Sequence, residues 1–389
     1  MDYQKKLLPA KVGTIGYGLL GIGALSIAIS FAVDSHRAFF DYLWMYMFLV
    51  SIGVGSLALV ALEYLVGATW STPFRRVSEF LAALIPVIVV LTIPLMFGLH
   101  DLFHWSHPEA VAADPLLQAK EPYLNVQFFT VRVVIYLAIW LIFFYLFIRN
   151  SEKQDLTGDP SLTKQSIKFS AVFAILFLLT MAFASMDWMM SLEPHWYSTM
   201  FGVIYFAGTL LAAFGAATFC AVNLNEKGYF QKKLSNNHYY SFGVFMFAFV
   251  IFWAYLAFSQ YMLIWYADIP EETFWIIMRM KNGWEYFSIG LIFFHFVLPF
   301  IILLPRSSKV NPKLLKIMAI WVVVSHAYDL YWIIMPTYFK EFTFGWSELG
   351  VMLFAAGLMI TVFKYRADRK NLVPVKDPKL QAGLDYHLT

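Results

Sequence analysis

Ten stretches of about 20 apolar residues recur along the 389-residue sequence, and each is long enough to cross the hydrocarbon core of a bilayer as a helix. These continuous runs lack the alternation of barrel strands, and a spanning helix bonds its own backbone groups. The sequence therefore predicts an all-α integral membrane protein with ten transmembrane helices, at 13–33, 42–66, 80–99, 126–148, 169–186, 197–223, 239–266, 286–304, 314–335 and 347–365.

The amino-acid composition agrees with a membrane protein and excludes several other classes of protein. The chain is 60% hydrophobic and only 14% charged, whereas soluble domains carry about a quarter charged residues. A disordered chain and a nucleic-acid binder need charge that this sequence lacks. The one cysteine, Cys220, excludes an intramolecular disulfide, a Cys-rich iron–sulfur or zinc site, and haem attachment through C-x-x-C-H.

Lysine and arginine in the loops predict the orientation of the chain. If the N-terminus is cytoplasmic, the inner segments hold 22 of these residues and the outer loops hold 5. Both termini are therefore expected in the cytoplasm, with residues 366–389 as a cytoplasmic tail. The first apolar stretch is too long for a signal peptide, and no small-residue cleavage site follows it before Asp34.

Three expected outer connections are rich in aromatic residues: His100–Asn125, 187–197 and Ala267–Glu285. Tryptophan and tyrosine gather at membrane interfaces because each ring is apolar and carries one polar group. The aromatics can therefore be simple interfacial anchors, or they can form a surface on which an external partner docks.

Ionisable side chains inside the spans carry most of the functional information, because each costs several kcal/mol unless it is paired or hydrated. They occur at different expected depths. Glu63 is near the inner end of its span, the two histidines His295 and His326 are central, and Asp329 and Arg132 approach the outer side. Such a ladder can carry protons, but each residue can equally be a hydrogen-bonded strut or, for Glu63 and Arg132, a snorkelling side chain.

The ninth span shows the clearest pattern. His326 and Asp329 are three residues apart and so share one helix face, with Ser325 beside it. A carboxylate near an imidazole can fix its tautomer and raise its pKa, which suits a proton carrier. His295 is expected at a similar depth to His326 because each lies about nine residues from the outer end of its helix. Two histidines at one depth also permit a b-type haem, although di-haem helices usually carry two histidines each.

Two tracts resemble one family of membrane proteins: FASMDWMMSLEPHWYSTMFGVIYFAG (183–208) and SHAYDLYW (325–332). Together with the ten-span plan, they resemble the smaller NrfD-like (polysulfide-reductase-like) membrane subunit of alternative complex III, a bacterial quinol:cytochrome c or quinol:oxidase oxidoreductase. The resemblance covers essentially the whole chain. The two tracts also add Asp187 and Tyr328 to the proton-path residues, which are Glu63, Arg132, Asp187, His295, Ser325, His326, Tyr328 and Asp329.

The resemblance implies two four-helix bundles, spans 2–5 at 42–186 and spans 6–9 at 197–335, flanked by outer helices in one polytopic domain. It implies a bacterial inner-membrane location and these partners: a larger NrfD-like sister subunit, an iron–sulfur subunit, cytochrome c subunits, small membrane subunits, lipids and a terminal oxidase. Haem c and iron–sulfur clusters then belong to the partners. The sequence itself shows no Gly-rich phosphate loop, catalytic triad or metal-binding triad.

The leading interpretation is therefore a non-catalytic subunit of a respiratory quinol oxidoreductase that carries no redox cofactor and conducts protons. A second interpretation gives this chain its own quinol pocket near the outer face, with His195 or His326 as the proton acceptor. A third is an unrelated secondary transporter. Secondary transporters are marked by pairs of helices that glycine or proline interrupts and that polar residues line. Such pairs are scarce in this sequence, so this interpretation is disfavoured.

Overall fold

The structure of the protein is a computed structural model that describes residues 6–230 and 232–387. Lys5, which was counted in the orientation argument, and the last two residues of the tail lie outside the described residues. Within the described ranges every regular element is a helix, and ten helices or helix runs are long and apolar enough to cross a membrane. The expected number of spans is thus confirmed, and the chain is a multi-pass membrane protein.

Each expected apolar segment overlaps one of these runs. They are α1 (Ala10–Val33), α2 (Ser35–Val66), η1–α3–α4 (Thr72–Phe97), α8 (Val126–Thr157), α9 with η3 (Ser161–Leu192), α10 (Met200–Glu226), α11 (Asn236–Ala267), α13–η4–α14 (Trp284–Leu303), α16 with η5 (Pro312–Thr337) and α17 (Trp346–Arg369). Shorter helices lie in the connections: α5 (Leu99–Leu102), η2 (His104–Ser106), α6 (Pro108–Ala113), α7 (Pro115–Lys120), α12 (Pro270–Met278), α15 (Arg306–Val310) and α18 (Leu380–Leu384).

Helix α2 is the central helix of the molecule. In its most apolar 18-residue stretch, 94% of the residues are buried, against 17% for α1. It contacts α1, α3, α4, α9, α10, α16 and α17. Polar residues on α2 therefore face other helices rather than lipid, and each must find its partner within the protein.

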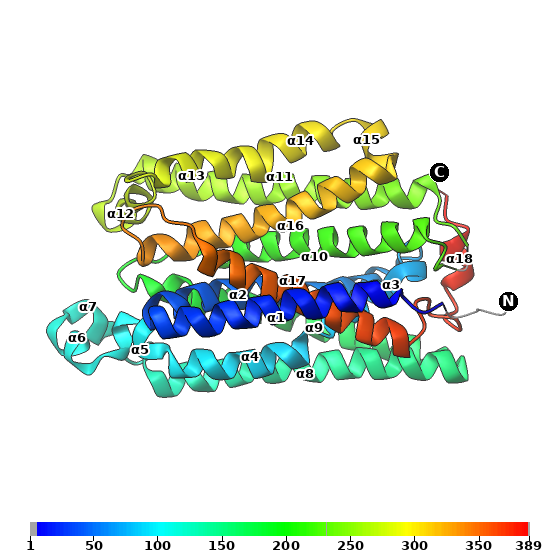
Figure 1. Ribbon diagram of the computed structural model, residues 1–389, viewed down its shortest axis with the longest axis horizontal. Helices are drawn as coiled ribbons and strands as arrows, with labels where there is room; N and C mark the ends of the chain where they lie inside the picture. Colours follow the sequence, from blue (N-terminus) through cyan, green and yellow to red (C-terminus); the bar gives the residue numbers. More distant parts are fainter. Residues whose placement is uncertain (1–5, 231, 388–389) are drawn as a thin grey trace.

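The remaining helices pack around α2 in two groups (Figure 1). Contacts join α2 with α3, α4 and α9, and α8 with α4 and α9. Contacts also join α10 with α11 and α16, α11 with α14 and α16, and the α13–α14 run with α16. The groups meet where α10 contacts α2 and α9, and where α16 contacts α2. Helices α1 and α17 pack closely on each other and contact α2 from one side.

Both chain ends lie at the same end of the molecule, beside α18, which we call the terminal end (Figure 1). Helices α5–α7 and α12 lie at the opposite end, which we call the loop end. Residues 370–387 do not project as a separate tail, since Asp377 Oδ2 accepts a 2.7 Å bond from Arg75 and the Gly383 carbonyl lies 2.9 Å from His238 Nε2.

The α8–α9 connection and the third span differ from what hydropathy predicts. The expected inner loop 149–168 is almost entirely helical, because α8 and α9 continue past their apolar runs and leave only Gly158–Pro160 between them. Gly158 ends α8 in the left-handed conformation at φ 70°. The third span is divided at Ala83–Leu84, and Pro86 stands at the start of α4, where its missing N–H is tolerated.

The α1–α17 contact yields a matched test. A Cβ atom at Gly23 would lie 2.4 Å from the Phe354 backbone nitrogen, whereas one at Gly21 would meet nothing within 4 Å. We expect Gly23→Leu to separate α1 from α17 and lower the thermal midpoint of the detergent-purified protein by several degrees, while Gly21→Leu leaves it within about one degree. Equal midpoints for the two variants would contradict this packing.

Candidate functional site

Three buried ionisable residues meet between α16 and the α13–η4–α14 run. One ring nitrogen each of His295 and His326 and one carboxylate oxygen of Asp329 all lie within 4.8 Å of one another. The two histidines are completely buried, and Asp329 is 3% exposed. The sequence predicted a similar depth for His295 and His326, and the structure brings these two residues together. Asp329, which the sequence placed on the same helix face as His326, lies beside them. We call this set the His–His–Asp cluster.

Spacing along the chain does not by itself predict this cluster. No metal-binding triad is visible in the sequence, because His295 and His326 are 31 residues apart and lie on different helices. In the structure the three groups are close enough to hold a metal ion. The same donor set suits protons equally well, because imidazole and carboxylate groups both titrate.

His326 is held by the central helix. Its Nε2 atom lies 2.9 Å from Ser51 Oγ on α2. Ser51 Oγ in turn lies 3.1 Å from the hydroxyl of Tyr205 on α10, and both hydroxyls lie within 3.0 Å of the Met47 carbonyl. Gly208 on α10 leaves room for the ring, since a Cβ there would lie 2.7 Å from His326 Nδ1. The imidazole therefore joins a hydrogen-bonded chain that links α16, α2 and α10.

His295 lies in a π-helical turn, η4 (Ile292–Val297). A π turn pairs each N–H with the carbonyl five residues earlier, and Leu298 N–H accordingly donates to Phe293. The next carbonyl, that of Phe294, would need Pro299, which has no N–H. Ser325 Oγ and Trp321 Nε1 donate to it instead, at 2.9 and 2.8 Å.

Ser325 and Tyr328 both bond backbone carbonyls of the α13–η4 run. Ser325 bonds the carbonyl of the π turn, and Tyr328 donates to the Phe287 carbonyl at 2.7 Å while its ring stacks on Phe287 at 3.7 Å. Both side chains tie α16 to the α13–η4 run. Neither makes a hydrogen bond to the His–His–Asp cluster among the described residues.

Trp253 on α11 packs against the cluster. Its ring stacks on His295 with centroids 3.7 Å apart, and its Nε1 atom donates to Asp329 Oδ2 at 2.9 Å. Within the described residues, both ring nitrogens of His295 and the Nδ1 atom of His326 have no hydrogen-bond partner. A buried polar atom without a partner costs about 1–3 kcal/mol. The cluster therefore keeps sites at which a proton can be taken up or donated.

Arg132 and Asp187, which the sequence offered as proton-path residues, form a closed ion pair instead of snorkelling. The guanidinium makes two bonds to the carboxylate, Nε–Oδ2 at 2.8 Å and Nη2–Oδ1 at 2.9 Å. Tyr123 and Tyr136 donate to the same carboxylate. Asp187, expected at the outer edge, is fully buried. This pair joins α8 to α9 and has few remaining bonding positions.

Glu63 is likewise bound within a network of charges near the terminal end. Its Oε1 accepts from Arg75 at 3.0 Å and from Thr72 at 3.1 Å. Arg75 also bonds Asp377 and Glu79, and Arg76 bonds Glu79 and Asp155. This network fixes the residues after α17 against α2 and α3.

The hydrogen bonds between the described residues leave three separate groups rather than one continuous ladder. The Arg132–Asp187 pair and the Glu63 network are closed by opposite charges, whereas the His–His–Asp cluster contains no cation. The geometry therefore singles out His295, His326 and Asp329 from the eight residues that the sequence suggested.

Four residues around the cluster were not expected from the sequence: Ser51, Tyr205, Gly208 and Trp253. Ser51 carried a weak signal, because it is a hydroxyl within an apolar span, but its direction depends on how α2 is rotated. Trp253 resembled an ordinary apolar residue of α11. Its contacts with His295 and Asp329 depend on which helices are neighbours.

His195, a proton acceptor in the quinol interpretation, lies far along the chain from the cluster in the 193–199 connection. It is exposed, and its Nε2 atom lies 2.5 Å from Asp114 Oδ2. The His195 bond and the Leu116 N–H hold the pKa of Asp114 below its usual value. In the same connection, burial raises the pKa of Glu193 while the Arg279 charge opposes this shift. His195 is thus a surface partner of Asp114 and does not line the cluster.

Comparison with known proteins adds no identification: no protein-family model matches the chain, and no curated protein matches it.

The Arg132–Asp187 pair can be tested by a double-mutant cycle. Removing one charge of a buried pair leaves the other uncompensated, so Arg132→Met or Asp187→Asn alone should cost about 3–5 kcal/mol of unfolding free energy. The double variant Arg132→Met/Asp187→Asn should cost clearly less than the sum of the two. Unfolding by a denaturing detergent measures all three, and additive losses would show that the pair is not coupled.

Proposed function

We propose that this chain is a membrane subunit of a respiratory quinol:electron-acceptor oxidoreductase of the alternative complex III type, in which the His–His–Asp cluster takes up and passes on protons. The chain itself carries no redox cofactor in this proposal and is not catalytic alone. Quinol oxidation releases protons, and a membrane subunit that moves them needs titratable groups that are not closed off by ion pairs.

The observation that carries the proposal is the convergence of the two tracts that resemble this family. Tract 183–208 supplies Tyr205 and Gly208, and tract 325–332 supplies His326 and Asp329. The Tyr205 and His326 rings lie with centroids 6.3 Å apart, and Gly208 borders the His326 ring. The residues on which the resemblance rests thus belong to one buried site.

The chemistry of the cluster supports proton transfer. Imidazole is the side chain whose ordinary pKa lies nearest neutral pH, and each ring can bind a proton at one nitrogen while it releases one at the other. His326 already bonds Ser51 through one nitrogen while its second has no partner among the described residues. Ser51 and Tyr205 extend that chain through hydroxyl groups, which both donate and accept.

The same proposal gives the chain its setting. The excess of lysine and arginine on one side favours cytoplasmic termini in a bacterial inner membrane, and the two helix groups then correspond to two four-helix bundles flanked by α1 and α17. The proposed partners are a larger NrfD-like sister subunit, an iron–sulfur subunit, cytochrome c subunits and small membrane subunits. The aromatic loop end is the face on which we expect the external partners to dock.

Isolation from the native membrane tests the assembly. A tagged copy of the chain should co-purify with haem-containing and iron–sulfur subunits, visible as cytochrome absorbance after reduction and as an iron–sulfur signal in electron paramagnetic resonance. A colourless chain recovered alone under mild detergent would contradict the proposal and favour a transporter.

The role of the cluster is tested by His326→Gln in the assembled complex. We expect quinol oxidation to persist while the number of protons released per electron falls, because glutamine can keep a bond to Ser51 but cannot titrate. Tyr328→Phe is the matched control, since Tyr328 lies on the same helix and bonds Phe287 rather than the cluster. Stopped-flow measurements with a pH dye report both quantities, and an unchanged ratio in His326→Gln would refute proton transfer through this site.

A further inference from the structure

Three unpartnered histidine nitrogens distinguish the His–His–Asp cluster from the other buried polar sites. Both ring nitrogens of His295 and Nδ1 of His326 lack a hydrogen-bond partner, and no other buried histidine nitrogen among the described residues does. His238 is equally buried, but its Nδ1 lies 2.9 Å from Ser235 Oγ and its Nε2 lies 2.9 Å from the Gly383 carbonyl. Unpartnered buried polar groups in a native protein need an explanation, and a bound ion is one.

The hydrogen bonds around His326 leave a lone pair on its Nδ1 atom. Tyr205 donates its hydroxyl proton to the Met47 carbonyl at 3.0 Å, so the 3.1 Å contact between Ser51 Oγ and the Tyr205 oxygen requires the Ser51 proton. The Ser51 oxygen then accepts from Nε2 of His326, which carries the ring proton. The other nitrogen of a neutral imidazole is an acceptor. Metal-bound histidines usually donate their second nitrogen to a neighbouring acceptor in the same way.

Asp329 and His295 also keep ligand atoms available. Trp253 donates to Asp329 Oδ2 at 2.9 Å, and Oδ1 accepts no hydrogen bond from the described residues. The Trp253 ring stacks on His295 with centroids 3.7 Å apart, which fixes the plane of the imidazole. One ligand atom from each of His295, His326 and Asp329 lies within 4.8 Å of the other two. Three atoms at that limit lie about 2.8 Å from their common centre, so shifts of under about 1 Å give zinc–ligand bonds of roughly 2.0–2.2 Å.

A cavity of about 670 Å³ lies beside the cluster, between α10, α11, α12, α13–η4 and α16. Asp329 and Trp253 belong to its lining. The lining reaches towards the loop end through Tyr261 of α11 and Met280 after α12, which are 44% and 46% exposed. The cavity therefore gives an ion a route to the cluster and leaves room for a further ligand such as water.

The charged groups of this cavity favour a cation at the cluster. Arg279 is the cationic side chain of the lining, and its nitrogens donate to the carbonyls of Trp332, Trp275 and Ile333 at 2.6–3.0 Å. Asp329 is the anionic side chain of the lining, and it forms no salt bridge within the described part of the chain. An ionised Asp329 therefore has no paired counter-charge, and a bound cation supplies one.

We propose that His295, His326 and Asp329 form a binding site for a divalent transition-metal ion of the zinc class, with His326 binding through Nδ1 and a fourth position facing the cavity. Zinc uses two imidazoles and one carboxylate where three protein ligands leave the fourth position open, and it has no redox chemistry. Magnesium and calcium prefer oxygen ligands. The inference goes beyond the proposed function and does not rest on it. An ion and a proton use the same lone pairs, so the cluster holds one or the other at a time.

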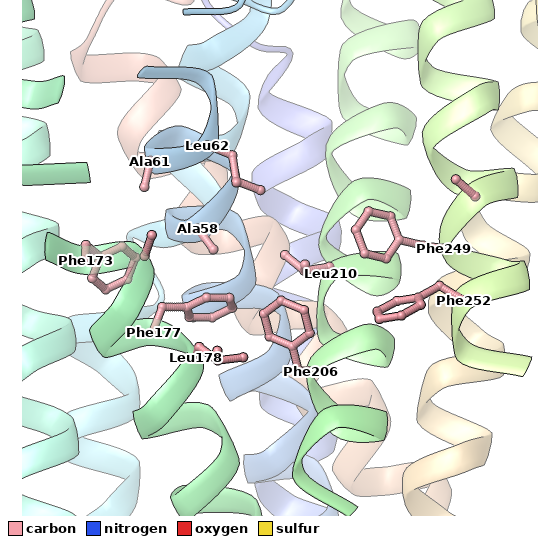
Figure 2. A pocket seen from close by; sticks show the side chains of 12 residues that line it. Ala58, Ala61, Leu62, Phe173, Phe177, Leu178, Phe206, Leu210, Phe249 and Phe252 are labelled. Atoms are coloured by element: carbon pink, nitrogen blue, oxygen red, sulfur yellow. The ribbon is translucent and has the colours of Figure 1, made fainter. Parts of the chain in front are cut away.

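Two other places in the structure provide comparisons. A second cavity of about 510 Å³ lies between α2, α9, α10 and α11 (Figure 2). All its lining side chains are alanine, leucine or phenylalanine, so it offers no ligand to an ion although it borders α10 and α11 as well. At the loop end, the rings of His100 and His107 have centroids 5.2 Å apart, and His100 is exposed. This pair is the rival zinc site at the surface.

The test uses the complete chain, in its complex where one is recovered, purified with a tag that contains no histidine. After equilibration with Zn²⁺ and removal of the free ion, we expect one bound zinc per chain at this site by elemental analysis, and two imidazole ligands in its X-ray absorption spectrum. Ser51→Ala keeps all three ligands and should weaken zinc binding about tenfold to hundredfold, which is the effect of losing a partner of a metal ligand. His295→Gln and Asp329→Asn should weaken it further.

The double variant His100→Gln/His107→Gln is the matched control and should retain the zinc. Zinc content that stays unchanged in both His295→Gln and Asp329→Asn would overturn the assignment, and so would loss of zinc in the control, which would indicate a surface ion only. A ligand variant can also fail to fold, so the thermal midpoint of the control variant is measured with and without Zn²⁺. A bound ion should raise this midpoint, and no rise at saturating zinc would equally overturn the site.

The outcomes separate this inference from the proposed function. If zinc binds at the cluster while His326→Gln leaves the number of protons released per electron unchanged, the metal site stands and the proton role fails. If His326→Gln lowers that number in a protein whose cluster binds no zinc, the proton role stands and the metal site fails.

Discussion

The structure depends on one constraint: inside a bilayer, a polar side chain must be bonded by another part of the protein. Helix α2 shows the consequence most clearly. Along its length, Asp41 bonds Ser347 on α17, Ser51 bonds His326 on α16 and Tyr205 on α10, and Glu63 bonds Arg75 on α3. Polar groups at successive depths of one central helix thus fix the positions of the helices around it. Apolar packing alone would define these positions less sharply, because lipid is as apolar as the helix surfaces.

Buried charges of the same residue types nevertheless serve different roles, which their partners reveal. The carboxylate of Asp187 accepts from one arginine and two tyrosines, so a change in its protonation would leave several donors unmatched. The carboxylate of Asp329 accepts one bond from Trp253 and lines a cavity. We therefore regard the first as a fixed support between α8 and α9, and the second as a group that can exchange a proton with a neighbour or ligand.

The π turn explains how the cluster is positioned. Pro299 leaves the Phe294 carbonyl without an intrahelical donor, and α16 supplies Ser325 and Trp321 in its place. These two bonds fix α16 beside the turn that contains His295. The carbonyl that has no donor in its own helix thus connects the two helices. His295 is then stacked on Trp253, and the same tryptophan bonds Asp329. One indole ring thereby joins the imidazole, the carboxylate and the cavity wall.

The sequence by itself determined the ten spans, the common face of His326 and Asp329, and the similar depth of the two histidines. These features depend on local properties of the chain: the free energy of transferring each segment into hydrocarbon, and the rise per residue and period of a helix. Only the tertiary structure decided that Arg132 pairs with Asp187 across 55 positions, that Asp377 returns to Arg75, and that Trp253 borders both cluster and cavity. The reason is that hydropathy sets how deep a residue lies, whereas its partner depends on which helices are neighbours and how each is rotated about its axis.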